Sequence, residues 1–230
     1  MKTETTKVSD QIIFLPFYSM LTENEKIFLE RNSVIRKYNK NEIFYESNDE
    51  WHGMMYQISG SMKIFITSRE GRNINLFRIE HNEIYVFSAS CVERKIPLQT
   101  SIRVEEPSEI LIINPSAASK LINENIYVRC FIYENSTVNF SNVMMTMEQI
   151  LFSSVEERLS LFLIKEYTRI GNSEIKMTHE QIAEQVNSVR EVIARMLKKF
   201  SEQGIVSLKR NTVKIENPDA LAFMAGKYPA

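Results

Sequence analysis

A chain of 230 residues, 43% of them hydrophobic and 25% charged, is long enough to bury one large core or two smaller ones. Its net charge of −1 excludes a protein that is basic throughout. No apolar run approaches the ~20 residues that span a bilayer, and residues 1–10 do not resemble a signal peptide, so we expect a cytoplasmic protein with no membrane partner. Cys91 and Cys130 are too few for a disulfide scaffold and lack zinc spacing, so we expect two buried free thiols.

The N-terminal part changes from a helical to a strand-like pattern near Ser33. Apolar residues after Gln11 and a capping-box sequence, Thr22-x-x-Glu25, predict short helices within residues 11–32. Eight short runs separated by turn residues follow, with turns predicted at Gly60 and at Glu106-Pro107 among others. This spacing predicts an antiparallel roll or sandwich, with strands at 34–38, 43–46, 54–59, 61–67, 73–79, 84–87, 101–104 and 110–113.

After Pro115 the pattern becomes helical and regular. Eight residues recur at alternating spacings of four and three, which is the heptad period of helices that pack against a partner helix. The alternative is that this face packs on its own domain. We expect a homodimer instead, with this seam as its interface: Ile126, Cys130, Tyr133, Thr137, Phe140, Met144, Met147 and Leu151.

A break at residues 152–154 has the composition of a hinge, and an amphipathic helix is predicted from Val155 until Gly171. A pair of short helices follows. Thr178-x-x-Gln181 begins the first, and Asn187 supplies the turn. Ser188 is predicted to open the second helix in a capping box with Glu191, with Val189, Ile193, Met196 and Leu197 facing inward.

Outward Arg190, Glu191 and Arg195 are the side-chain types that read base edges in a DNA major groove. Glu191 has two compatible roles, because a capping carboxylate can also accept from a cytosine amino group. The segment from Arg190 to Lys214 carries seven Lys and Arg against two Asp and Glu, a local charge of +5. Such charge fits a phosphate footprint, or alternatively a solvated helix face.

Gly204 ends the second helix, and alternating residues in 205–208 and 212–215 predict a small hairpin with a basic tip, which suits a phosphate-contacting wing. We therefore expect double-stranded DNA as a partner. The candidate DNA-binding residues are Thr178, Ser188, Arg190, Glu191, Arg195, Lys198, Lys209 and Arg210.

These residues resemble those of the Crp–Fnr family of transcription regulators. The resemblance lies in Thr178-x-x-x-Ile182-Ala183, in Arg190-Glu191-x-x-x-Arg195-x-Leu197-Lys198 and in Gly204-Ile205-Val206, with weaker matches at Tyr56-x-Ile58-x-Gly60 and Arg69-x-Gly71. It implies an α+β chain with a cyclic-nucleotide-binding-like β-roll (a double-stranded β-helix) at 1–120 that senses an effector. A dimerisation helix and hinge at 121–153 and a winged helix-turn-helix at 154–230 would follow.

By this resemblance, Arg190, Glu191 and Arg195 match the base-reading residues of the cyclic-AMP receptor branch. That branch reads palindromic sites with TGTGA-like halves as a homodimer. The resemblance also implies RNA polymerase as a partner.

The effector segment departs from the family pattern. Phe87 falls near the position of the acid that holds the ribose, and Leu98 near that of the arginine that holds the cyclic phosphate. We therefore do not expect cyclic AMP, and no cysteine cluster or convincing histidine supports an iron–sulfur cluster or haem. Cys91 is either a redox or ligand contact or a small apolar filler. An apolar or aromatic effector of unknown identity would contact Phe87, Ser88, Cys91, Val92, Leu98 and Thr100.

Two other functions remain open. A cupin-like roll can hold a small molecule or a catalytic metal, but His52, His81 and His179 are the chain's only histidines and the last lies in the C-terminal region. No phosphate loop or nucleophile motif is present, so we expect neither an enzyme nor a metal site. A module that binds a partner protein would not need Arg190 and Arg195 to face outward.

Overall fold

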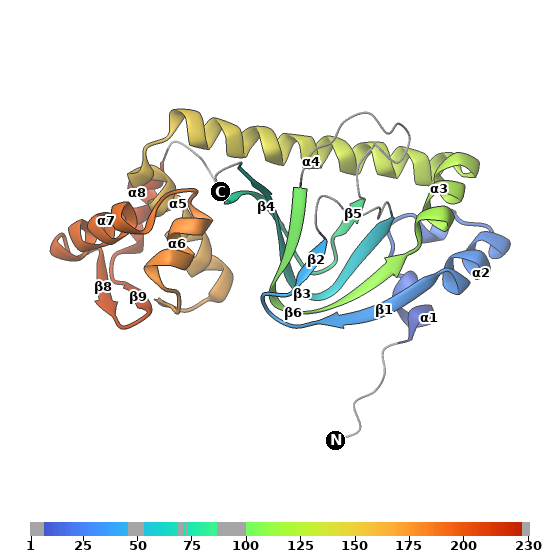
Figure 1. The fold of residues 1–230 in the computed structure, drawn as a ribbon, viewed down its shortest axis with the longest axis horizontal. Coiled ribbons are helices and arrows are strands. Elements are labelled where there is room, and N and C mark those ends of the chain that lie inside the picture. The colour runs from blue at the N-terminus through green and yellow to red at the C-terminus, as the bar shows by residue number, and fades with distance from the viewer. Residues whose placement is uncertain (1–6, 46–52, 69–70, 72, 87–99, 227–230) are drawn as a thin grey trace, which may run out of the picture. The chain divides into compact units, whose positions relative to one another are not determined.

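The computed structural model describes residues 7–45, 53–68, 71, 73–86 and 100–226. The chain forms two compact units: residues 1–71 with 76–144, and residues 72–75 with 145–230. The first is an antiparallel β-roll with helices before and after it, and the second is a helical domain with a small three-stranded sheet (Figure 1). The predicted α+β class is thereby confirmed.

Short helices precede the roll: α1 (Val8–Ile12), the 3-10 helix η1 (Tyr18–Met20) and α2 (Glu23–Arg31). The predicted capping box opens α2. The Thr22 backbone N–H donates to Glu25 Oε2 at 2.7 Å, and the Glu25 backbone N–H donates to Thr22 Oγ1 at 3.3 Å. These two bonds satisfy backbone donors that the first turn of a helix leaves without a partner.

Two long antiparallel strands, β3 (Met54–Thr67) and β6 (Thr100–Ile113), form the centre of the roll's sheet. Strands β1 and β2 pair with β6, whereas β4 and β5 pair with β3. The shorter strands are β1 (Ser33–Tyr38), β2 (Ile43–Tyr45), β4 (Asn73–Ile79) and β5 (Ile84–Val86).

The turns predicted at Gly60 and at Glu106-Pro107 are wrong, because β3 and β6 continue through both positions. The β3–β6 register shifts three times between Gln57 and Met62. Both positions therefore lie in an irregular stretch of two continuous paired strands, and the chain does not turn there. Gly60 has a φ of 77°, which glycine adopts more readily than residues with a side chain. The four predicted strands in these regions are therefore two.

Side chains of the roll gather in two apolar clusters on opposite faces of the strands. Met54 and Tyr56 belong to a cluster that α1, α2, α3 and the start of α4 cover. Met55, which lies between these two residues in β3, belongs to the cluster on the opposite face. That cluster is rich in aromatic rings, with partly buried Tyr38, Phe44, Tyr45, Phe77 and Tyr85 around buried aliphatic residues. Burial, together with the neighbouring Tyr45 phenol, raises the pKa of Tyr85.

Two helices follow the roll: α3 (Pro115–Glu124) and α4 (Ile126–Phe152), which meet at Asn125. Asn125 Oδ1 accepts from the backbone N–H groups of Tyr127 at 3.0 Å and Val128 at 3.2 Å, so its side chain caps α4. Near its start, α4 buries Val128 and Ile132 against the roll.

The second unit packs its helices around one apolar core. As predicted, a new helix begins after the break at Ser153-Ser154, and Gly171 in the left-handed conformation ends it. Its helices are α5 (Val155–Ile170), α6 (His179–Gln185), α7 (Arg190–Glu202) and α8 (Pro218–Ala225), and its strands are β7 (Glu174–Ile175), β8 (Val206–Lys209) and β9 (Thr212–Ile215).

Two elements of this unit, β7 and α8, were not predicted from the sequence. Strand β7 is two residues long and pairs with β9, so no period could reveal it. Helix α8 begins with Asn217, whose side chain accepts from the Ala220 backbone N–H at 3.0 Å, followed by Pro218 at the first helical position. An N-cap asparagine followed by proline is an ordinary helix-start signal, so α8 could have been predicted from the sequence.

Candidate nucleic-acid interface

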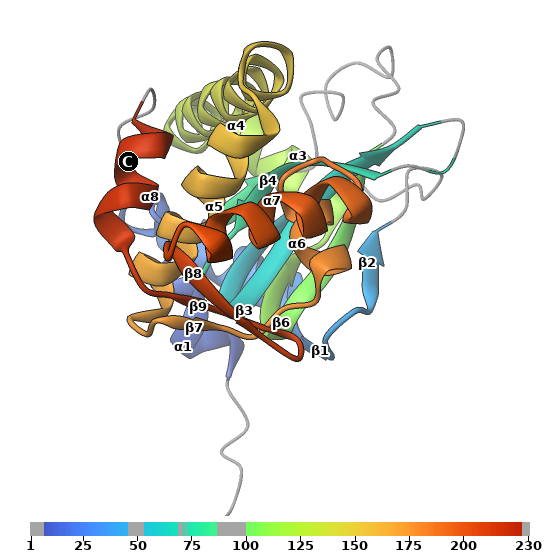
Figure 2. The same cartoon turned by 90° about the vertical axis from the view of Figure 1, so that its left-hand side faces the viewer.

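Helices α6 and α7 form a helix-turn-helix (Figure 2). The predicted capping box begins α6: the Thr178 backbone N–H donates to Gln181 Oε1 at 2.8 Å, and the Gln181 backbone N–H donates to Thr178 Oγ1 at 3.2 Å. Asn187 makes the turn with a φ of 52°, and the Ser188 N–H then donates to the Ala183 carbonyl at 2.9 Å. Asparagine tolerates this left-handed conformation better than most residues.

The predicted capping box between Ser188 and Glu191 is wrong. Helix α7 begins at Arg190 with Val189 as its N-cap residue, and no side chain caps it. Ser188 therefore lies one residue too early to act as the cap. The prediction that Val189 faces the core is also wrong, since the side chain of this residue is 46% exposed. The Glu191 carboxylate forms no hydrogen bond or ion pair with any residue that the structure describes, so its acceptor oxygens remain available.

Helix α7 has two opposite faces. Its buried residues, Ile193, Leu197 and Phe200, follow the spacing i, i+4, i+7. Glu191, Arg195 and Lys198 follow the same spacing two residues earlier, which is a rotation of about 200° around the helix. These three side chains consequently point away from the core, and all are exposed.

Arg190 and Arg195 are exposed, and neither guanidinium is engaged by another residue in the described part of the chain. Glu191 and Arg195 stand at i, i+4 on the helix, but no salt bridge joins them. Both guanidinium groups therefore keep their donors free for a ligand, and Arg190 sits at the first position of the helix.

Several neighbouring cations are partly neutralised. Lys199 Nζ lies 2.9 Å from Glu156 Oε2, and Lys209 Nζ lies 3.1 Å from Glu174 Oε1. Lys198 Nζ lies 3.8 Å from Glu202 Oε1, with both side chains exposed. Such surface pairs are worth ~0–1 kcal/mol, so a phosphate can compete for these cations.

Strands β8 and β9 form the predicted hairpin, with Lys209 paired to Thr212. Arg210 and Asn211 form its tip, and Asn211 has a φ of 54°. The tip residues are exposed, and Arg210 makes no ion pair to any described residue. The hairpin and β7 together form the sheet of a winged helix-turn-helix.

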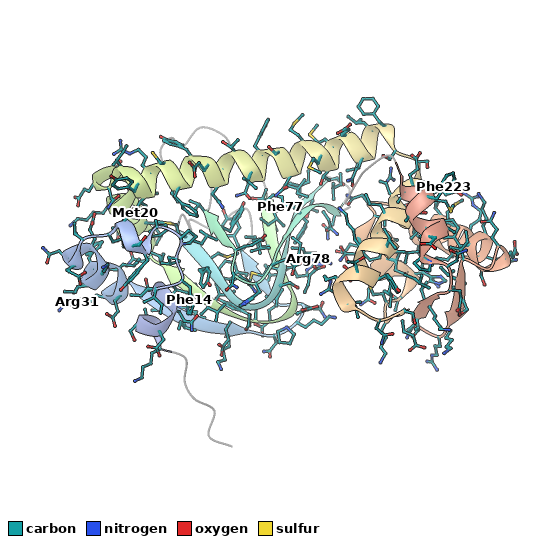
Figure 3. All side chains as sticks on the ribbon, turned by 180° about the vertical axis from the view of Figure 1, so that it is seen from behind. Phe14, Met20, Arg31, Phe77, Arg78 and Phe223 are labelled. Carbon is teal, nitrogen blue, oxygen red and sulfur yellow. The ribbon has the colours of Figure 1, made fainter. Side chains whose placement is uncertain are left out.

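The predicted seam of α4 is not covered by its own domain. All eight of its positions are exposed, whereas Val128 and Ile132 on another face of the helix are buried. Phe140 is 64% exposed and Leu151 67% exposed. Figure 3 shows side chains, some of them with sulfur atoms, standing out along the length of α4. Cys130 is exposed, so the prediction that it is a buried thiol is wrong for the single chain.

The predicted effector residues Phe87, Ser88, Cys91, Val92 and Leu98 lie outside the described residues. Thr100 is described: it is the first residue of β6, is partly buried, and pairs with Ile66 of β3. His81 and His179 are described as well, and His52 is not. Within the described ranges, no three His, Cys, Asp or Glu side chains are grouped closely enough to hold a metal ion. None of the described helices combines the length and apolar character needed to traverse a bilayer.

The α6–α7 pair and the hairpin define a winged helix-turn-helix, a class of DNA-binding domain. Residues 157–224 match the family model of the Crp-like helix-turn-helix domain. A solved structure from Eubacterium rectale, described as a transcriptional regulator of the Crp/Fnr family, is 30% identical. That match covers 93% of this chain and 99% of the other, with a TM-score of 0.88.

Two more distant relatives are also named as regulators. The cAMP-activated global transcriptional regulator CRP of Pasteurella multocida is 20% identical over 79% of this chain and 89% of its own length. The structure of the c-di-GMP responsive regulator CLP of Xanthomonas campestris is 18% identical, covers 84% of this chain and 99% of that chain, and has a TM-score of 0.69.

The chain belongs to the Crp/Fnr family of transcription regulators. It carries the helix-turn-helix DNA-binding domain of that family. Since these relatives are named as transcription regulators, they lend no support to the alternative of a cupin-like enzyme.

Proposed function

We propose that this regulator reads DNA sequence with α7, and that Arg190, Glu191 and Arg195 contact base edges in the major groove. One observation carries the proposal: two exposed guanidinium groups without an ion pair, and an exposed carboxylate without a hydrogen bond, share the first half of α7. Glu191 and Arg195 lie opposite the buried face, and Arg190 is exposed at the first helical position. An arginine can donate two bonds to guanine O6 and N7, and a glutamate accepts from cytosine N4.

The reading set favours a half-site like TGTGA, because these residues match those of the cyclic-AMP receptor branch. Val189, which the sequence analysis placed in the core, is exposed beside Arg190 and suits contact with a thymine methyl group. The remaining candidates, Thr178, Ser188, Lys198, Lys209 and Arg210, suit contacts to phosphate, which position the domain on the duplex without reading sequence.

We propose a homodimer joined through the seam of α4. A row of exposed apolar side chains at heptad spacing, from Ile126 to Leu151, supports this. Burying one large apolar side chain in such a contact contributes ~1.5–3 kcal/mol, so the full row is ample for association. A two-fold dimer would place two α7 helices in successive major grooves, about 34 Å apart, on a palindromic site.

In this proposal the three predicted segments keep distinct tasks: sensing at 1–120, dimerisation at 121–153 and DNA binding at 154–230. The effector is proposed to be something other than cyclic AMP, in agreement with Phe87 and Leu98 at the two key positions of the segment. One relative is named for cAMP and another for c-di-GMP, so the shared fold does not fix the signal. RNA polymerase is the proposed partner on DNA, and the cytoplasm the proposed place of action.

Fluorescence-anisotropy titration of a labelled TGTGA palindrome tests the function, with a scrambled duplex of the same length beside it. A regulator of this kind binds the palindrome more tightly, and its affinity falls linearly on a log–log plot against salt. Lys165→Ala removes an exposed cation from α5 and serves as the control for loss of charge alone. Equal affinity for both duplexes would contradict the proposal.

A further inference from the structure

Arg158, on the first turns of α5, holds three main-chain carbonyl groups at once. Its Nη1 donates to the Ser153 carbonyl at 2.7 Å and to the Gln149 carbonyl at 3.4 Å. Its Nε donates to the Val186 carbonyl at 3.1 Å. Gln149 lies in the last turn of α4 and Ser153 directly follows that helix, while Val186 is the C-cap residue of α6.

These carbonyls lie at the C-terminal ends of helices, where the last carbonyls lack intrahelical partners and the negative end of the helix dipole is found. The Gln149 carbonyl also accepts from the Ser153 backbone N–H at 3.1 Å, so Arg158 adds a second donor there. A guanidinium suits two such ends together, because it is always charged and carries five donors in a rigid plane. Arg158 therefore caps α4 and α6 with one side chain.

Local structure fixes the position of this arginine. Ser154 and Glu157 form a capping box, with the Ser154 backbone N–H donating to Glu157 Oε2 at 2.8 Å and the Glu157 N–H donating to Ser154 Oγ at 3.1 Å. The Arg158 backbone N–H donates to the Ser154 carbonyl at 3.1 Å. Because the first turn of α5 is held in this way, the guanidinium has a defined origin from which to reach both helix ends.

The Arg158 hydrogen bonds join the helix of the proposed dimer interface to the helix-turn-helix. Helix α4 carries the dimer seam, and α6 is the first helix of the helix-turn-helix. Arg158 and the three residues that it contacts all lie in the 145–230 part of the second unit. The angle between the end of α4 and the helix-turn-helix would decide where each α7 lies in a dimer.

We infer that Arg158 is a positioning residue that sets the orientation of the helix-turn-helix on α4, and thereby the spacing between DNA half-sites that the dimer accepts. The inference rests on the proposed function, since it requires a dimer that reads two half-sites. Arg158 itself need not touch DNA. Its loss loosens the geometry and leaves the base-reading surface of α7 intact.

The test is a spacer series: palindromes whose half-sites are moved apart or together one base pair at a time. Each base pair adds about 3.4 Å and about a tenth of a helical turn, so a rigid dimer prefers one spacing sharply. The variants are Arg158→Met, which keeps much of the side chain's length without donors, and Arg158→Lys, which keeps the charge but not the planar fork. Arg169→Gln, on the same helix, removes a guanidinium that pairs with Glu166, so it is the matched control.

For Arg158→Met we expect a loss of about tenfold or more on the best palindrome and a flattened spacing profile. Affinity for a duplex with a single half-site should stay within about twofold of the wild type. The affinity and spacing profile of Arg158→Lys should fall between those of the wild type and Arg158→Met, and Arg169→Gln should keep the wild-type profile. Light scattering should show the same oligomeric state for all variants. A merely structural role would lower affinity at every spacing alike and would not change the profile.

An unchanged spacing profile in Arg158→Met would overturn the inference and leave the proposed function in place. If Arg158→Met does not fold, the profile of Arg158→Lys decides in the same way. A wild-type protein that prefers no spacing and no sequence would overturn the proposed function, and the inference would fall with it.

Discussion

Gly60 on β3 and Pro107 on β6 approach each other so closely that a Cβ atom on Gly60 would lie 2.3 Å from the Pro107 carbonyl oxygen. The same atom would lie 2.5 Å from the Ser108 hydroxyl. Ser108 Oγ in turn accepts from Gln57 Nε2 at 2.8 Å, so the contact belongs to a buried polar group within the ladder. Only a residue without a side chain fits here.

Gly60→Ala should therefore destabilise the roll by ~2 kcal/mol or more, because the variant combines a strained φ with a clash against backbone atoms. Gly71→Ala is the matched control: Gly71 has a φ of 79°, but no atom of the described residues lies within 4 Å of its would-be Cβ. It should cost only the backbone strain, ~1 kcal/mol. Urea unfolding followed by circular dichroism measures both, and equal losses would show that the close approach carries no weight.

The same contact explains why part of the roll could not be read from the sequence. A glycine and a Glu-Pro pair are each good local turn signals, and each predicts the end of a strand. The two positions face each other across the ladder and share one irregularity, with Ser59 opposite Glu109 and Ser61 opposite Glu106. Pairing between residues about fifty apart in the chain leaves no local signal.

In α4 and the DNA-binding region too, features set by local spacing were predictable from the sequence, and features set by contacts between distant residues were not. Spacing alone predicted the exposure of Glu191 and Arg195 on α7 and of the eight heptad positions on α4, because helical periodicity is local. The start of α7 was placed wrongly, since the turn at Asn187 delays the helix until Arg190. Arg158 was not singled out at all, because its acceptors are main-chain carbonyls and any residue supplies those.

Thr178 and Ser188 offer a matched pair for testing the observed caps. Thr178→Ala should lower the free energy of unfolding of the second unit by ~1 kcal/mol, since it removes the acceptor of the Gln181 N–H. Ser188→Ala should change it by less than ~0.5 kcal/mol, since Ser188 caps nothing. Thermal unfolding of the two variants measures the difference, and a larger loss for Ser188→Ala would restore the capping box that the sequence predicted.

Arg190→Ala should weaken binding to the specific site by ~1–3 kcal/mol and relax the preference at one base position. The fold should be unaffected, because the side chain is exposed and has no partner among the described residues. Binding to the single-base variants of the operator reveals which position has relaxed. An unchanged base preference, with Lys165→Ala measured beside it, would remove Arg190 from the reading set.

Phe140→Asp should convert the proposed dimer to a monomer, because it places a charge in the middle of the apolar seam. Val138→Asp is the control: Val138 is 58% exposed on the same helix but lies outside the heptad positions. Light scattering across a dilution series gives the association constant for each. If both variants weaken the dimer equally, the interface is not the predicted seam.

Glu25 should make the start of α2 sensitive to acid. Burial acts to raise the pKa of this carboxyl, but hydrogen bonds from Thr22 and Asn125 outweigh it, and the pKa is lowered. A lowered folded-state pKa means that the ionised group stabilises the fold above its unfolded pKa, ~4.3, and that this stability is lost as the pH falls through the folded value. Hydrogen exchange of the α2 amides should therefore be slower in the wild type than in Glu25→Gln near pH 7, and the difference should shrink in acid.

Glu23→Gln removes a carboxylate of the same turn that pairs with Lys26, so it controls for loss of charge. Because Asn125 Nδ2 donates to Glu25 Oε1 at 3.0 Å, the start of α4 should show the same acid dependence. Acid dependence at α2 alone would mean that the Asn125 bond does not couple the two helices.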